Sequence, residues 1–125
     1  MRYLHTMLRV VDLEKSIRFY TDCLGLTLKK RKDYPEGKFT LAFLGNESDE
    51  EGFLELTYNW ETQHYDKGNA YGHMAFHAPN IYKACEQIQA LGGKIVRPPG
   101  PMKHGATMIA FVEDPDGYKV ELIQR

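Results

Sequence analysis

The chain has 125 residues, enough for one domain whose hydrophobic core needs no disulfide to hold it. Apolar residues make up 42% and charged residues 26% of the sequence, as is typical of a globular protein. The net charge is −1 and the lysines and arginines are scattered, so the basic surface of a nucleic-acid-binding protein is missing. No apolar run approaches the roughly 20 residues that span a bilayer, and the first residues lack the apolar stretch of a signal peptide. We therefore expect a cytoplasmic protein with neither nucleic acid nor membrane as a partner.

The two cysteines stand alone. Cys23 and Cys85 lie in helix-like segments, far apart and outside any Cys-x-x-Cys motif. We expect two half-buried free thiols in a reducing compartment.

The first half of the chain predicts a strand, a helix and three further strands. The passage 5–12 alternates in polarity like a strand and ends at Asp12, a residue type that caps helices. A helical stretch with one apolar stripe follows, and it ends at Leu24-Gly25. The three strands are then expected at 26–31, 38–45 and 52–59, with a turn at 34–37.

The second half repeats this order. The passage 73–80 ends at Asn80, and a helical stretch runs to Leu91-Gly92. The next strands are expected at 94–97, 106–112 and 118–123, separated by Pro-Pro-Gly-Pro and by the tight turn Asp-Pro-Asp-Gly. The stretch 98–103 fits a lid over a site and a plain connector equally well.

The repetition predicts a duplicated α+β architecture. Module one covers about 1–60, a linker about 61–71 and module two about 72–125, within a single domain 1–125. Each module of about 60 residues is marginal alone, so the modules should pack together or pair their edges.

Two His-to-Glu pairs recur at matching distances in the halves. His5 precedes Glu55 by 50 residues and His73 precedes Glu121 by 48, and each glutamate sits in a short apolar run. Two imidazoles and two carboxylates without a thiolate favour a five- or six-coordinate divalent ion that retains water over a closed structural zinc site.

Strand parity adds a polar group to each strand of the first module. Arg9 shares a face with His5, and Asn59 shares one with Glu55, each four residues further on. At roughly 3.3 Å per residue these groups lie about 13 Å from the candidate ligands. The pattern indicates an elongated site with a metal at one end and hydrogen-bonding groups further out.

These motifs closely resemble one known family. The passages His5-Thr-Met-Leu-Arg-Val, Leu54-Glu-Leu-Thr-Tyr-Asn-Trp60, Ala70-Tyr-Gly-His73 and 111–122 are similar to those of the glyoxalase I (lactoylglutathione lyase) family. That family belongs to the vicinal-oxygen-chelate superfamily, which has paired βαβββ modules. The resemblance implies that His5, Glu55, His73 and Glu121 ligate a metal in a homodimer, each site taking the first two ligands from one subunit and the last two from its partner.

The resemblance also implies a substrate and a reaction. The substrate would be the hemithioacetal of methylglyoxal and glutathione, isomerised to S-lactoylglutathione through a metal-stabilised enediolate. Glu121 would be the main base, with Glu55 returning the proton. The short chain and a His as first ligand are similar to the bacterial class that prefers nickel or cobalt over zinc.

The same resemblance assigns the ends of glutathione. Arg9 and Asn59 match the positions that bind the γ-glutamyl end. Arg97 and Lys103 are candidates for the glycyl carboxylate on charge complementarity alone. Asn69 stands where some eukaryotic members carry Arg, so the glycyl contacts depart from the family pattern.

Other functions of this superfamily remain as alternatives. An acyl-CoA epimerase would share metal-bound enolate chemistry but would not need Arg9 and Asn59. An extradiol dioxygenase uses two His and one Glu on iron, which leaves one carboxylate unexplained. A drug-binding protein of the bleomycin-resistance kind has no metal, and a fosfomycin-type thiol transferase is a further possibility.

Overall fold

The computed structural model describes all 125 residues and divides into two compact units, Met1–Asp66 and Lys67–Arg125. The boundary falls inside the linker predicted at 61–71. That the two modules form a single domain stays a prediction. No helix is long and apolar enough to cross a membrane.

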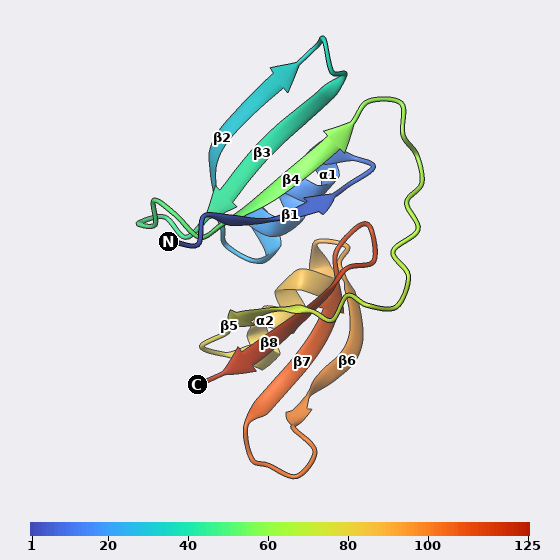
Figure 1. The fold of residues 1–125 in the computed structure, drawn as a ribbon. Helices are drawn as coiled ribbons and strands as arrows, with labels where there is room; N and C mark the ends of the chain where they lie inside the picture. Colours follow the sequence, from blue (N-terminus) through green and yellow to red (C-terminus); the bar gives the residue numbers. More distant parts are fainter. The chain divides into compact units, whose positions relative to one another are not determined.

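The first unit contains one mixed four-stranded sheet with a helical segment against it (Figure 1). Its elements are β1 (His5–Arg9), α1 (Leu13–Arg18), the π-helical turn η1 (Phe19–Cys23), β2 (Thr27–Tyr34), β3 (Phe39–Gly45) and β4 (Phe53–Asn59). The strand order is β1-β4-β3-β2, with β1 parallel to β4 and the other pairs antiparallel.

The second unit has the same topology. Its elements are β5 (Met74–His77), α2 (Ile81–Ala90), β6 (Lys94–Pro101), β7 (Met108–Glu113) and β8 (Lys119–Gln124). The strand order is β5-β8-β7-β6, and β5 is parallel to β8. The predicted α+β class with two βαβββ modules is therefore confirmed.

Both helices begin at the predicted caps. The Asp12 carboxylate accepts a hydrogen bond from the backbone N–H of Lys15, and the Asn80 side chain accepts one from Lys83, each at 3.1 Å. These bonds satisfy N–H groups that have no partner within the helix. Gly25 and Gly92 each directly follow the C-cap residue of a helical stretch, and their φ angles of 81° and 89° suit glycine.

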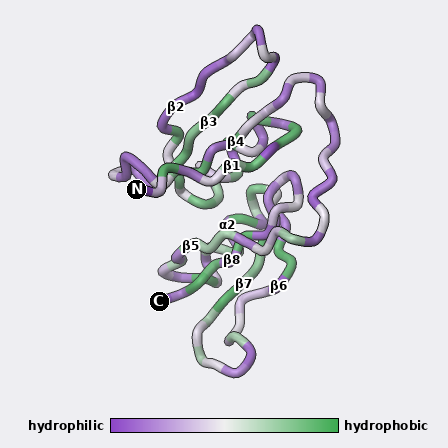
Figure 2. The backbone as a smooth tube through the Cα atoms, viewed as in Figure 1, coloured by the Kyte–Doolittle hydropathy of each residue, from purple (hydrophilic) through white to green (hydrophobic).

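One face of each sheet forms a core with its helix. In the first unit Val10, just after β1, and the strand residues Ala42, Leu44 and Leu56 are buried, and the helical segment packs against this face of the sheet. In the second unit Ala110, Val112, Val120 and Leu122 lie beneath Ile81, Cys85 and Ile88. Strand β2 is hydrophilic along most of its length (Figure 2), as suits an edge strand, and its residues 29–32 are the basic run Lys-Lys-Arg-Lys. In each sheet, the face that points away from the helix carries the candidate site residues.

The predicted break at 98–101 is wrong, because β6 continues through these residues. Gly100 pairs with Ile109 and Pro101 with Met108, so the stretch 98–103 is neither a lid nor a plain connector as a whole. Prolines are tolerated here because β6 is an edge strand, where a missing N–H costs no ladder bond. Two register shifts, on either side of Arg97, absorb the irregular residues.

The turn predicted at 114–117 leads directly into β8. The buried Asp114 carboxylate accepts hydrogen bonds from the backbone N–H groups of Asp116 (2.9 Å) and Tyr118 (2.8 Å). Gly117 adopts a φ of 89° and donates its N–H to the Asp114 carbonyl. This rigid turn fixes the start of the strand that carries Glu121.

Candidate metal centre and active site

The first His-to-Glu pair lies on the uncovered face of the first sheet. His5 begins β1 and Glu55 lies on the adjacent strand β4. Nε2 of His5 is 3.6 Å from Oε2 of Glu55, and the side chains are 40% and 12% exposed. Both groups thus point the same way from neighbouring strands, with the carboxylate largely buried and the imidazole at the surface.

The second pair repeats this arrangement in the second unit. His73 directly precedes β5 and Glu121 lies on β8. Nε2 of His73 is 3.5 Å from Oε1 of Glu121, and the side chains are 42% and 17% exposed. Neither unit brings a third histidine, cysteine, aspartate or glutamate to its pair.

The spacing of each pair fits two ligands of one divalent ion. A separation of 3.5 or 3.6 Å is too long for a good hydrogen bond between the two side chains. Two donors held about 2.1 Å from a common ion would lie about 3.0 Å apart at an octahedral angle and about 3.4 Å apart at a tetrahedral angle. A side-chain shift of about half an ångström would therefore bring either pair onto one ion of five- or six-fold coordination. The donor set, imidazole nitrogen and carboxylate oxygen, also suits such an ion. Each pair by itself therefore fits two ligands of a divalent ion.

Contacts between the residues before His5 and those at the start of β4 hold His5 in place. Arg2 pairs with Glu51 at 2.8 Å, and the Leu4 carbonyl accepts the backbone N–H groups of Gly52 and Phe53. The N-terminal residues are thereby tied to the start of β4, two residues before Glu55.

A tyrosine gives His73 a similar anchor. Tyr71 donates its hydroxyl to the carbonyl of Lys119 at 3.2 Å, and its ring meets that of Tyr118 edge to face. Burial, and next the nearby Asp114 carboxylate, raise the pKa of Tyr71, so the phenol stays protonated and remains a donor. The segment before His73 is thus joined to the strand that carries Glu121.

The polar groups predicted further along the strands have distinct surroundings. Arg9 is exposed at the end of β1. The side-chain amide of Asn59, at the end of β4, donates to the hydroxyl of Tyr65 at 2.9 Å. Arg9 and Asn59 share the face of the sheet that carries His5 and Glu55, as strand parity predicted.

The two basic candidates for binding the glycyl carboxylate differ in exposure and in hydrogen bonding within the protein. Lys103 is exposed in the loop between β6 and β7. Arg97 instead donates from Nη1 to the carbonyls of Gly100 (2.9 Å) and Ile109 (2.8 Å), and from Nη2 to that of Pro101 (2.8 Å). The guanidinium of Arg97 therefore fastens its own hairpin.

Sequence reasoning missed one phenylalanine beside each pair. The ring of Phe43 on β3 meets that of His5, and the ring of Phe111 on β7 meets that of His73. The only signal in the sequence is that both occupy equivalent positions of the repeat, one strand before the glutamate.

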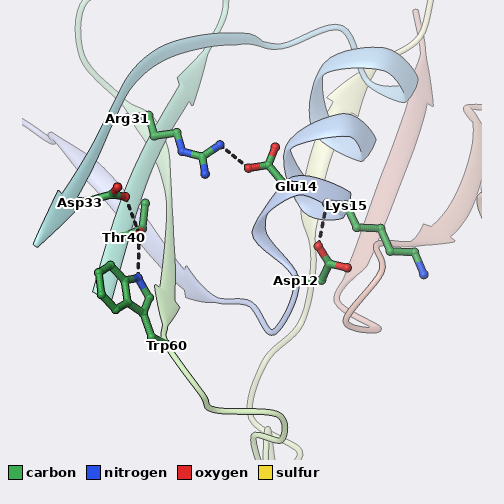
Figure 3. Close-up of polar contacts among 7 residues, drawn as sticks. All are labelled: Asp12, Glu14, Lys15, Arg31, Asp33, Thr40 and Trp60. Atoms are coloured by element: carbon green, nitrogen blue, oxygen red, sulfur yellow. Dashed lines mark hydrogen bonds and ion pairs between the residues drawn. The ribbon is translucent and has the colours of Figure 1, made fainter. Parts of the chain in front are cut away.

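A cavity of about 450 Å³ lies elsewhere, between the start of α1 and strands β2 to β4. Arg31 reaches from β2 to Glu14 at its rim, and Trp60 donates its Nε1–H to Thr40, which donates in turn to Asp33 (Figure 3). Thr40 alternates with Phe39 and Leu41 along β3, so the cavity is on the face opposite to His5 and Glu55.

The cysteines take no part in either pair. Both thiols are unpaired, Cys85 buried and Cys23 partly so. Burial raises the pKa of each thiol, and at Cys23 the Asp22 carboxylate adds to the effect. Both remain protonated at neutral pH and act as small apolar side chains.

Comparisons with known proteins define the class. The family model described as Glyoxalase/Bleomycin resistance protein/Dioxygenase superfamily matches residues 2–122. Among solved structures, glyoxalase I from Zea mays superposes with a TM-score of 0.94 at 48% identity over 99% of this chain. The chain spans 44% of the length of that maize chain. A trypanothione-dependent glyoxalase I from Leishmania major gives a TM-score of 0.84 at 39% identity, covering 99% of this chain and 86% of the other.

Curated relatives are similar along more than nine tenths of their length. The lactoylglutathione lyase of Neisseria meningitidis serogroup A is 60% identical, covering 100% of this chain and 91% of that protein. The probable lactoylglutathione lyase of Synechocystis is also 60% identical, covering 97% and 93%. The chain therefore belongs to the lactoylglutathione lyase (glyoxalase I) family of this superfamily, a family of enzymes.

Proposed function

We propose that this enzyme isomerises the hemithioacetal of methylglyoxal and glutathione to S-lactoylglutathione. Family membership supports the reaction, and one observation supports the site: two His-to-Glu pairs at metal-ligand spacing, in equivalent positions of a repeated module. The two unpaired thiols are typical of a reducing compartment, which supports a cytoplasmic location.

In this proposal His5, Glu55, His73 and Glu121 hold one divalent ion per site. When bound, the ion would supply positive charge to neutralise what develops on two vicinal substrate oxygens. We propose nickel or cobalt rather than zinc, because the chain resembles the short bacterial class. The ligand set by itself does not choose among these ions.

The four ligands come from two units, and we propose that a homodimer assembles them. The N-terminal unit of one subunit would meet the C-terminal unit of its partner. Both β1 and β5 are edge strands, each paired with one neighbouring strand; His5 begins β1, and His73 directly precedes β5. The exposed apolar side chains of Tyr3, Leu4 and Met7 lie along the first of these edges.

The proton transfer needs a base beside the C–H group next to a carbonyl. We assign this role to Glu121 and the return of the proton to Glu55. Both carboxylates are mostly buried, which shields the transferred proton from bulk water.

We propose that Arg9 and Asn59 bind the γ-glutamyl end of the thiol. For the glycyl carboxylate, Lys103 is the better placed of the two predicted residues, since carbonyl oxygens already occupy Nη1 and Nη2 of Arg97. Binding of Arg97 to that carboxylate stays a prediction. The Leishmania relative depends on trypanothione, so the thiol itself must be tested.

The test is reconstitution of metal-stripped protein. Nickel, cobalt or zinc is added in turn, with methylglyoxal and glutathione, and thioester absorbance is followed. We expect no turnover without metal, and faster turnover with nickel or cobalt than with zinc. Coenzyme A esters serve as substrates for the epimerase alternative. Binding of metal without thioester formation would contradict the proposed reaction.

A further inference from the structure

Each histidine of the two pairs meets a phenylalanine in the same geometry. The ring centroids of His5 and Phe43 are 5.7 Å apart with an interplanar angle of 78°. Those of His73 and Phe111 are 5.3 Å apart, also at 78°. Because the two units are separate copies of one module, the contact is observed twice in different sequence surroundings.

The strand order explains how this contact forms. In the first unit β4 lies between β1 and β3, and Phe43 is directly opposite Glu55 in the antiparallel register. In the second unit β8 lies between β5 and β7, and Phe111 is directly opposite Glu121. Each imidazole therefore reaches over the glutamate strand and meets the ring on its far side.

Each phenylalanine restricts rotation of the neighbouring imidazole ring. A metal-bound histidine usually donates its second ring N–H to a carboxylate or carbonyl, which fixes the plane of the ring. Neither imidazole has such a hydrogen bond here, and each ring instead lies beside its glutamate and edge to face with its phenylalanine. Rotation about the second side-chain torsion of histidine is otherwise loosely restricted.

We propose that Phe43 and Phe111 are positioning residues that fix the planes of the His5 and His73 imidazoles. Each half of the metal site is then oriented before the ion binds. Edge-to-face packing is favourable for two aromatic rings and holds their planes at a large angle to each other. This inference rests on the proposed function, because it takes the histidines as metal ligands.

The test measures metal binding rather than turnover. The variants Phe43→Leu and Phe111→Leu keep an apolar side chain but remove the ring, and Phe43→Tyr and Phe111→Tyr restore a ring. Competition with a chelator gives the nickel dissociation constant of the metal-stripped dimer. We expect each Leu variant to bind about tenfold more weakly and the Tyr variants to bind like the original protein. The visible spectrum of bound cobalt should change in the Leu variants only.

Phe39→Leu is the matched control. Phe39 lies on the same strand and face as Phe43 but stacks on Tyr34, at 4.7 Å and 14°, and does not touch His5. Its loss should leave nickel affinity and the cobalt spectrum unchanged. Thermal melts of each variant show that the fold is retained, and Phe43→Met and Phe111→Met replace any Leu variant that does not fold.

Two results would overturn the inference. The first is wild-type affinity and spectrum in both Leu variants. The second is an equal loss in Phe39→Leu, which would indicate a general effect on the sheet. Absence of metal binding by the original protein would instead count against the proposed function.

Discussion

At the scale of single residues, the two glutamates are distinguished from the other carboxylates by their depth in the sheet. Glu55 and Glu121 lie next to buried residues in their strands. Each directs its largely buried carboxylate toward a histidine that is partly exposed to solvent. Burying a carboxylate without a compensating partner is costly, so a site for a cation explains both positions together. A solvent-facing role explains neither.

Replacing Glu121 by Gln tests the assignment of the base. The amide keeps the size of the side chain but cannot take up a proton, so Glu121→Gln should lower kcat by about 10²-fold or more. The melting temperature of the metal-stripped variant should stay close to that of the original protein. Steady-state kinetics and circular dichroism measure the two effects.

Glu113→Gln provides the control for that experiment. Glu113 lies on the same sheet, between Lys94 on β6, at 3.9 Å, and Lys119 on β8, and belongs to neither His-to-Glu pair. Its replacement should leave kcat unchanged. If Glu121→Gln kept near-normal turnover, another group would have to be the base.

At the scale of elements, Arg97 stabilises the β6–β7 hairpin where its ladder is irregular. Its guanidinium donates to carbonyls on both strands, Gly100 and Ile109 among them. Arg97→Met should therefore lower the free energy of unfolding by about 1–3 kcal/mol, since the carbonyls lose charge-assisted bonds. Urea denaturation measures this. A large rise in KM with unchanged stability would instead support the predicted contact with the glycyl carboxylate.

The elements also show which features a sequence can predict. Helix caps at Asp12 and Asn80 and the turn at 114–117 follow from interactions within a few residues, and the structure confirms them. The continuation of β6 through three prolines depends on its place at a sheet edge, which local sequence does not encode. The two His-to-Glu pairs were recognisable because the repeat links them. Phe43 and Phe111 were not, because their contacts require the order of three strands.

At the scale of the whole molecule, each unit would supply half of the ligand set in the proposed site. Two ligands hold a divalent ion weakly, whereas four satisfy most of its coordination. A chain whose units each carry one pair therefore needs its halves combined, and a symmetric dimer would form two equal sites. Metal and dimer should then stabilise each other, so added nickel should raise the melting temperature.

Mixing two inactive variants tests whether subunits share a site. Under the proposed arrangement, a heterodimer of His5→Ala and Glu121→Gln contains one site with both changes and one with neither. After random subunit exchange half of the dimers are mixed, so activity should return to about a quarter of the original value. Exchange is verified by native mass spectrometry of a tagged subunit. A mixture that exchanges subunits yet stays inactive would place all four ligands within one chain, because every chain then carries a defective site.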